Sequence, residues 1–74
     1  MDTDITLDVR GLEPPEPLER VMDALPRLEP GRRLRLLIHR EPHPLYALLA
    51  RRGFAYSARA LDGPEYEILI WRMT

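Results

Sequence analysis

The segment from residue 7 to residue 17 constrains the fold more than any other part of the chain. Its sequence, LDVRGLEPPEP, runs from alternating apolar and polar residues through Gly11 to three prolines. The alternation is typical of a half-buried strand, and a glycine commonly ends such a strand. Prolines suit the start of a helix, where an N–H group would have no intrahelical partner. The segment therefore predicts a strand that ends at Gly11 and a helix that begins among the prolines.

Apolar periodicity predicts the remaining elements. Residues 18, 21, 22 and 25 are apolar at helical spacing, and residues 33–40 alternate as a second strand. Apolar residues 45, 48 and 49 follow Pro44 as a second helix, which Gly53 caps. Residues 54–61 and 65–73 alternate as two further strands, joined by a hairpin turn at Asp62-Gly63. The predicted order is strand, helix, strand, helix, strand, strand.

This order predicts an α/β protein, specifically an α+β two-layer sandwich. A strand–helix–strand crossover makes its two strands parallel, whereas a hairpin makes the last two antiparallel, so the four-stranded sheet is mixed. Both helices should cover one face of the sheet and leave the other face open. Residues 1–74 are expected to form a single domain, because a chain of this length can build only one core.

Composition excludes several classes of function. The chain has no cysteine, so it has no thiol nucleophile, disulfide or cysteine-type zinc site. It has no lysine for Schiff-base chemistry. A net charge of −1 argues against binding to nucleic acid or to an anionic membrane. Neither a signal peptide nor a membrane-spanning run is recognisable, so a cytoplasmic location without membrane contact is expected.

The segment from residue 7 to residue 17 also resembles the signature of the TusA/SirA sulfur-carrier superfamily. In that family Leu-Asp on a strand leads to Gly-Leu and then to Cys-Pro-x-Pro, whose cysteine carries the sulfur. Here Pro15-Glu16-Pro17 matches the Pro-x-Pro, and Pro14 occupies the carrier-cysteine slot. Residues 41–46 and 52–54 are similar to a cysteine-less branch of the superfamily, a domain of unknown function. The resemblance spans nearly the whole chain and implies the same two-layer sandwich.

Polar residues should gather where both predicted helices begin, at the carboxyl ends of the first two strands. Helix N-termini and arginines favour a phosphate or a carboxylate, whereas glutamates repel it and can pair with the arginines instead. The candidates for binding a ligand or an anion at this edge are Arg10, Glu13, Glu16, Arg40 and Glu41. Both the anion-binding and the purely structural interpretation remain open.

The two histidines are weak candidates for a metal site. His39 and His43 are four residues apart, a spacing that suits a metal on one continuous helix. Pro42 interrupts any such helix, so the spacing loses its meaning. Neither a metal nor a cofactor is expected.

The open face of the sheet carries the interface candidates Leu37, Arg59, Leu69 and Trp71. Tryptophan and arginine are enriched at the energetic centres of protein interfaces. This face is therefore expected to bind a protein partner or a second copy of the chain. Alternatively, Trp71 packs across the edge of the sheet.

Three functional hypotheses follow. The first is a small binding or adaptor domain that is not an enzyme, because the scaffold lacks a carrier nucleophile. The second is a metal- or small-anion-binding domain, at the helix N-termini, in a redox or sulfur-related pathway. The third is an RNA-binding module that stacks bases on its tyrosines and Trp71, against which the net charge of −1 argues.

Overall fold

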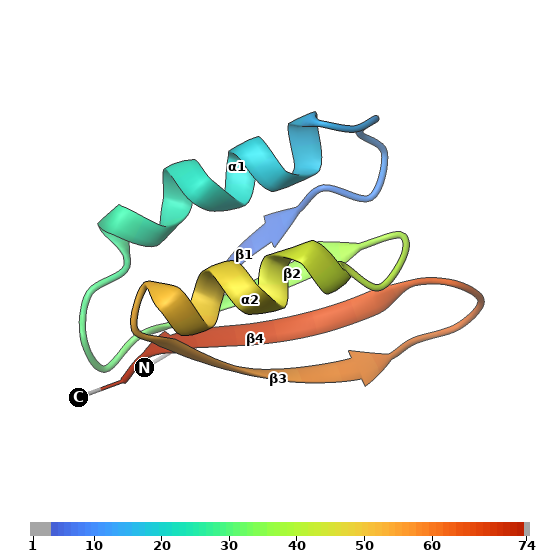
Figure 1. Cartoon of the computed structure of the whole chain (residues 1–74). Coiled ribbons are helices and arrows are strands. Elements are labelled where there is room, and N and C mark those ends of the chain that lie inside the picture. The colour runs from blue at the N-terminus through green and yellow to red at the C-terminus, as the bar shows by residue number, and fades with distance from the viewer. Residues whose placement is uncertain (1–3, 74) are drawn as a thin grey trace.

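The computed structural model describes residues 4–73, which form four strands and two helices (Figure 1). The elements are β1 (Asp4–Asp8), α1 (Glu16–Ala24), β2 (Arg33–Ile38), α2 (His43–Arg51), β3 (Phe54–Ala60) and β4 (Tyr66–Arg72). Their order is the predicted one. A 3₁₀ turn at Leu25–Arg27 follows α1, because Pro26 has no N–H group with which to continue the α-helical hydrogen bonds.

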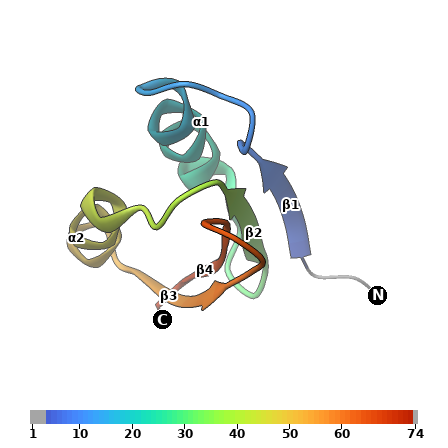
Figure 2. The same cartoon turned by 90° about the vertical axis from the view of Figure 1, so that its right-hand side faces the viewer.

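The sheet is mixed, as predicted, with the strand order β1-β2-β4-β3. β1 runs parallel to β2, and β4 runs antiparallel to both of its neighbours, β2 and β3. β4 is thus inserted between β2 and β3, and β1 and β3 form the two edges. Figure 2 shows both helices on the same side of the sheet, which confirms the two-layer arrangement.

The core lies between the helices and the face of the sheet that they cover. Alternate residues of the two central strands supply its floor, with Leu36, Ile68 and Ile70 completely buried. The helices supply its roof from one apolar stripe each. The buried apolar cluster comprises Val9, Val21, Leu25, Leu28, Leu34, Leu36, Ile38, Leu45, Leu49, Phe54, Ile68 and Ile70.

Strand β2 is shorter than predicted. It ends at Ile38, whereas the alternation of residues 33–40 predicted two more residues. Ile38 is the last residue of β2 that pairs with β4, where it lies opposite Tyr66. His39 and Arg40 have no strand partner and bend toward α2.

The turns follow the glycines. Gly53 ends α2 with a φ of 81°, and Gly63 forms the β3–β4 turn with a φ of 63°. Both values lie in the left-handed region that glycine adopts without steric cost. None of the helices in the described part of the chain is long and apolar enough to cross a membrane.

Because the sheet is covered on one face only, apolar residues on its two faces should contribute very differently to stability. We expect Leu36→Ala, on the covered face, to lower the free energy of unfolding by about 2–5 kcal/mol. Leu69→Ala on the half-buried open face is the matched control and should cost clearly less. Urea denaturation followed by circular dichroism measures both, and equal losses would contradict the one-sided core.

Candidate functional site

Both helices start at the same end of the molecule, where the loops after β1 and β2 lie (Figure 1). A pocket of about 300 Å³ lies between the two helix starts. We call it the helix-start pocket. Its lining residues are all apolar: Pro14, Pro15, Pro17, Leu18, Val21, Ile38, Pro42, Pro44 and Leu45.

The same four-residue pattern builds both walls of this pocket. Pro15-Glu16-Pro17-Leu18 begins α1, and Pro42-His43-Pro44-Leu45 begins α2. In each pattern the second proline lies within the first two helical positions, where its fixed φ fits the helix. The leucine that follows packs against the core. The repeated Pro-x-Pro-Leu is the sequence signal that could have predicted this pocket, which the analysis of single motifs missed.

The prolines also determine which hydrogen-bond donors the helix starts offer. At α2, the His43 N–H bonds to the Glu41 carbonyl at 3.1 Å, and the Leu45 N–H bonds to the Pro42 carbonyl at 2.9 Å. Pro44, between them, has no N–H. The first-turn donors that bind an anion at other helix N-termini are therefore used or missing at α2.

The start of α1 is similar, although the donor to its proline carbonyl is the fourth helical residue and not the third. The Glu16 N–H bonds to the Glu13 carbonyl at 2.9 Å, and the Glu19 N–H bonds to the Pro15 carbonyl at 3.2 Å. Pro17 has no N–H. Among the described residues, those that line the helix-start pocket also expose no polar surface to it. Its chemistry suits an apolar group rather than an anion.

The five residues predicted to bind a ligand or an anion make different contacts in the structure, and their role in binding stays a prediction. Arg10 lies over the open face of the sheet, where it bonds to Asp8 at 2.8 Å and Glu65 at 3.2 Å. Glu16 pairs with Arg20 along α1 at 3.7 Å. Glu13 and Arg40 are exposed.

The fifth residue, Glu41, belongs to a small cluster beside α2. The Tyr46 hydroxyl donates to Glu41 at 3.1 Å, and His43 Nε2 lies 3.4 Å from the other carboxylate oxygen. Tyr46 also stacks on Tyr56 of β3 with ring centroids 4.4 Å apart. Burial, reinforced by the Glu41 carboxylate, raises the pKa of Tyr46 above its ordinary value. The cluster ties the start of α2 to the edge strand.

The two histidines do not converge. His43 is exposed on α2, whereas His39 follows β2 and has a buried Nδ1 without a hydrogen-bond partner. Across residues 4–73, no group of three or more histidine, aspartate or glutamate side chains could hold a metal ion.

One of the interface candidates on the open face of the sheet is less exposed than expected. Leu37 is only 9% exposed, so its predicted exposure is wrong. Arg10, which follows β1, reaches Glu65, which precedes β4, so this ion pair bridges the two strands that flank β2. The cross-strand neighbours of Leu37 are Asp8 on β1 and Glu67 on β4. Leu69 and Trp71 are half-buried, and Arg59 is exposed. A role of these residues in partner binding stays a prediction.

Ion pairs neutralise most of the charge on the open face. Glu67, only 7% exposed, forms ion pairs with Arg59, its cross-strand neighbour on β3, and with Arg35, which lies diagonally from it on β2. Arg33 pairs with Asp4 across β1 and β2 at 2.9 Å. Basic side chains matched in this way do not form the continuous positive surface that binds RNA.

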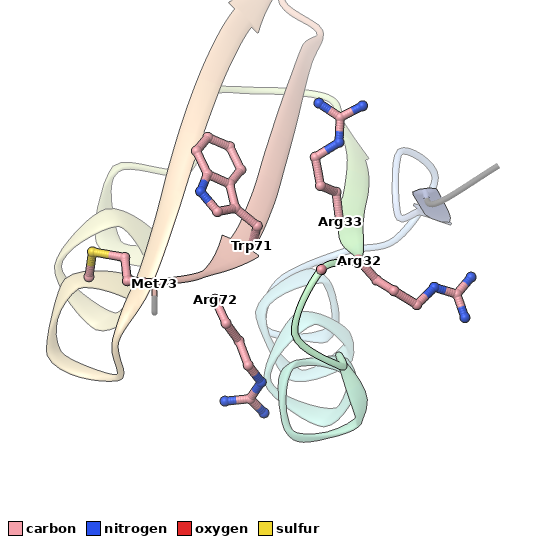
Figure 3. Close-up of a pocket in the computed structure, with 6 residues that line it drawn as sticks. Arg32, Arg33, Trp71, Arg72 and Met73 are labelled. Carbon is pink, nitrogen blue, oxygen red and sulfur yellow. The ribbon is translucent and has the colours of Figure 1, made fainter. Parts of the chain in front are cut away.

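A second, shallow hollow of about 590 Å³ lies at the far end of the sheet, where Trp71 lines it (Figure 3). Its side chains point apart: Arg33 and Trp71 rise from the open face, Arg72 projects to the other face, and Arg32 points away. Arg72 bonds to the carbonyl of Leu28 and lies over the Phe54 ring. The hollow thus lacks a set of convergent polar groups.

Comparison with known proteins finds a family that matches most of the chain. The model of an uncharacterized conserved protein family, DUF2249, matches residues 6–72, which include both helix starts. No curated protein and no solved structure matches the chain.

The ion pairs of Glu67 should contribute unequally to stability. Arg59 has 68% of its side chain exposed, so Arg59→Ala should cost at most about 1 kcal/mol. The Arg35 side chain is 39% exposed, and Arg35→Ala should cost about 1–3 kcal/mol, because Glu67 then depends on a solvent-exposed partner. The double variant should lose more than the sum, since it leaves the buried carboxylate unpaired. Urea unfolding of the three variants measures this, and strict additivity would refute it.

The pairing of Asp8 predicts a pH dependence. Hydrogen bonds from the Arg10 side chain and backbone lower the pKa of Asp8 from 3.8 to about 2. A carboxyl whose pKa is lower in the folded state stabilises the fold above its unfolded pKa. This contribution should disappear as the pH falls from 3.8 to about 2. NMR titration of the Asp8 carboxyl carbon measures the pKa, and Arg10→Ala should return it toward 3.8. A midpoint unaffected by this substitution would contradict the assignment.

Proposed function

Because the chain belongs to the DUF2249 family of uncharacterised conserved proteins, its function must be inferred from its own site, and we propose a non-enzymatic binding domain. It docks an apolar side chain of a partner protein in the helix-start pocket. One observation carries the proposal: prolines and aliphatic residues line this pocket completely, at the end of the molecule where both helices begin.

The size and rigidity of the pocket suit a single apolar side chain of the partner protein, which would act as the anchor. A volume of about 300 Å³ lies at the lower end of the range of ligand pockets, about 300–1,000 Å³. Five of the nine lining residues are prolines, whose rings have a fixed φ. A rigid pocket loses little conformational entropy when it is filled, and this favours binding. Interfaces commonly depend on one such desolvated apolar anchor.

Charges near the pocket indicate which residues would flank the anchor in the partner. Glu13 and Glu16 are exposed in the segment that forms the α1 wall of the pocket. Both are acidic, and Arg20 pairs with Glu16. Electrostatic complementarity favours arginine or lysine beside the apolar anchor.

The resemblance to the TusA/SirA superfamily agrees with this proposal. Pro14, which occupies the carrier-cysteine slot, forms part of the pocket wall. Proline has neither a thiol nor an N–H group, so this position offers a contact surface in place of a nucleophile. The proposed domain keeps the docking position of a carrier and carries no sulfur.

Selection from a random peptide display library tests the proposal. Peptides that bind the wild-type chain should share one leucine, isoleucine, methionine or phenylalanine next to a basic residue. Pro14→Asp places a charge in the pocket wall and should weaken a selected peptide at least tenfold, or about 1.4 kcal/mol. Pro64→Asp, at an exposed proline in the β3–β4 turn, is the matched control and should bind normally.

Backbone amide shifts in the NMR spectrum locate the bound peptide. They should change in residues 14–18 and 42–45. Peptides that bind the Pro14→Asp variant as tightly as the wild type, or that shift only residues of the open sheet face, would overturn the proposal.

A further inference from the structure

The second edge of the sheet is a long, uncovered strand. β3 spans Phe54–Ala60 and pairs with β4 on one side only. Residues 56–60 are all exposed. Figure 2 shows β3 at the border of the sheet, below α2. The strand contains no proline and a single charge, Arg59, so it lacks the usual devices that block the pairing of an edge.

The hydrogen bonds at the two ends of β3 show which of its backbone groups point outward. Gly53 accepts a bond from the Met73 N–H at 2.9 Å, and the Leu61 N–H donates to Glu65 at 2.8 Å. In an antiparallel pair, alternate residues direct both backbone groups toward the same neighbour. Odd-numbered residues from 53 to 61 therefore face β4. The N–H and C=O groups of Phe54, Tyr56, Ala58 and Ala60 face outward, and none has a backbone partner within residues 4–73.

We propose that two copies of the chain pair through β3, antiparallel, around a two-fold axis at Ser57. The two four-stranded sheets then join into one continuous sheet. In this register Tyr56 lies opposite Ala58 of the second copy, and Phe54 lies opposite its Ala60. These are the outward-facing residues, so every unpaired backbone group of β3 acquires a partner, with about eight hydrogen bonds in total.

The side chains of β3 are self-complementary in this register. Arg59 lies opposite Ala55 of the second copy, so the two arginines do not face each other. Each arginine is also already paired with Glu67 of its own copy at 3.0 Å. The Tyr56 ring, stacked on Tyr46, has small Ala58 as its cross-strand neighbour. Within β3 itself, neither like charges nor two bulky side chains lie opposite each other in this register.

The other edge of the sheet does not have this property. β1 is shorter, with five residues, and has an aspartate at each end, Asp4 and Asp8. Antiparallel self-pairing of β1 about Thr6 would place Asp4 opposite Asp8 of the second copy. Like charges directly opposite each other destabilise a strand pair. The comparison favours β3 as the edge that joins two copies.

A cysteine introduced at the two-fold axis tests the register, because the chain has no other cysteine. Ser57 would face its own counterpart in a non-hydrogen-bonded pair with Cα atoms about 4.5 Å apart. That distance lies within the range of a disulfide, about 4.4–6.8 Å. Ser57→Cys should form a disulfide-linked dimer at a rate about tenfold or more above that of a cysteine variant whose thiols meet only by random collision.

Arg59→Cys is the matched control, since it is exposed on the same strand and the same face. Its counterpart in the second copy would be displaced by four residues, about 13 Å, too far for a disulfide. Equal rates of cross-linking for the two variants would overturn the register.

Analytical ultracentrifugation and amide hydrogen exchange test the wild-type chain without any substitution. Up to about 1 mM, the average mass should rise toward the dimer. With it, exchange should slow at Tyr56, Ala58 and Ala60, whose N–H groups face outward. A strict monomer over this range of concentrations would overturn the proposal. So would a dimer in which these three amides still exchange fast, or slow exchange of these amides only when a different protein is bound. The helix-start pocket plays no part in either measurement, so this proposal and the proposed function succeed or fail separately.

Discussion

The burial of a single face of the sheet is the constraint on which the rest of this structure depends. A chain of 74 residues can build only one core, and both helices are needed to cover it. Leu36, Ile68 and Ile70 form the floor of that core, and Val21 and Leu49 lie above them. Because no further helix or strand among residues 4–73 covers the other face of the sheet, that face must be compatible with water. It meets this requirement through paired charges, and the edge strand β3 is left without cover.

The helix-start pocket follows from the way in which the two helices reach the core. Each begins with Pro-x-Pro-Leu, so its first turn presents proline rings and directs a leucine into the core. Prolines remove N–H groups that would otherwise attract an anion or water. With these prolines, the two helix starts present an apolar surface in place of free N–H groups. Chemistry and packing at this end of the molecule are thus two consequences of the same residues.

The open face shows why charged residues on a sheet do not by themselves indicate a binding site. Arg35 and Arg59 hold Glu67, and Arg10 spans β2 to reach Glu65. These pairs match opposite charges from different strands of the sheet. A basic residue that is already paired contributes little to attracting a distant anion. The balance of charge, rather than the number of arginines, determines what this face can bind.

Much of the architecture was predictable because local patterns and global fold agree. The alternation in β3 and β4 predicted their faces, and Gly53 and Gly63 predicted the turns. The end of β2 was not predictable, because alternation continues through His39 while the pairing partner does not. The exposure of Leu37 was also predicted wrongly, since its neighbours Asp8 and Glu67 come from two strands that are distant in sequence. The pairing of Arg10 with Glu65 was not predictable for the same reason, and the anion-binding role of Arg10 and the helix-start glutamates stays a prediction.

The sequence by itself determined the order of the elements, the faces of the strands and the absence of a thiol at position 14, because each depends on residue type and near neighbours alone. Only the tertiary structure decided that two distant Pro-x-Pro-Leu segments close one pocket, and that Arg10 pairs with Glu65 and not with the helix starts. Both outcomes depend on the crossover that brings the carboxyl ends of β1 and β2 together and on the place of β4 beside β2. Such contacts between residues far apart in sequence are set by the packing of the whole core, which no local pattern contains.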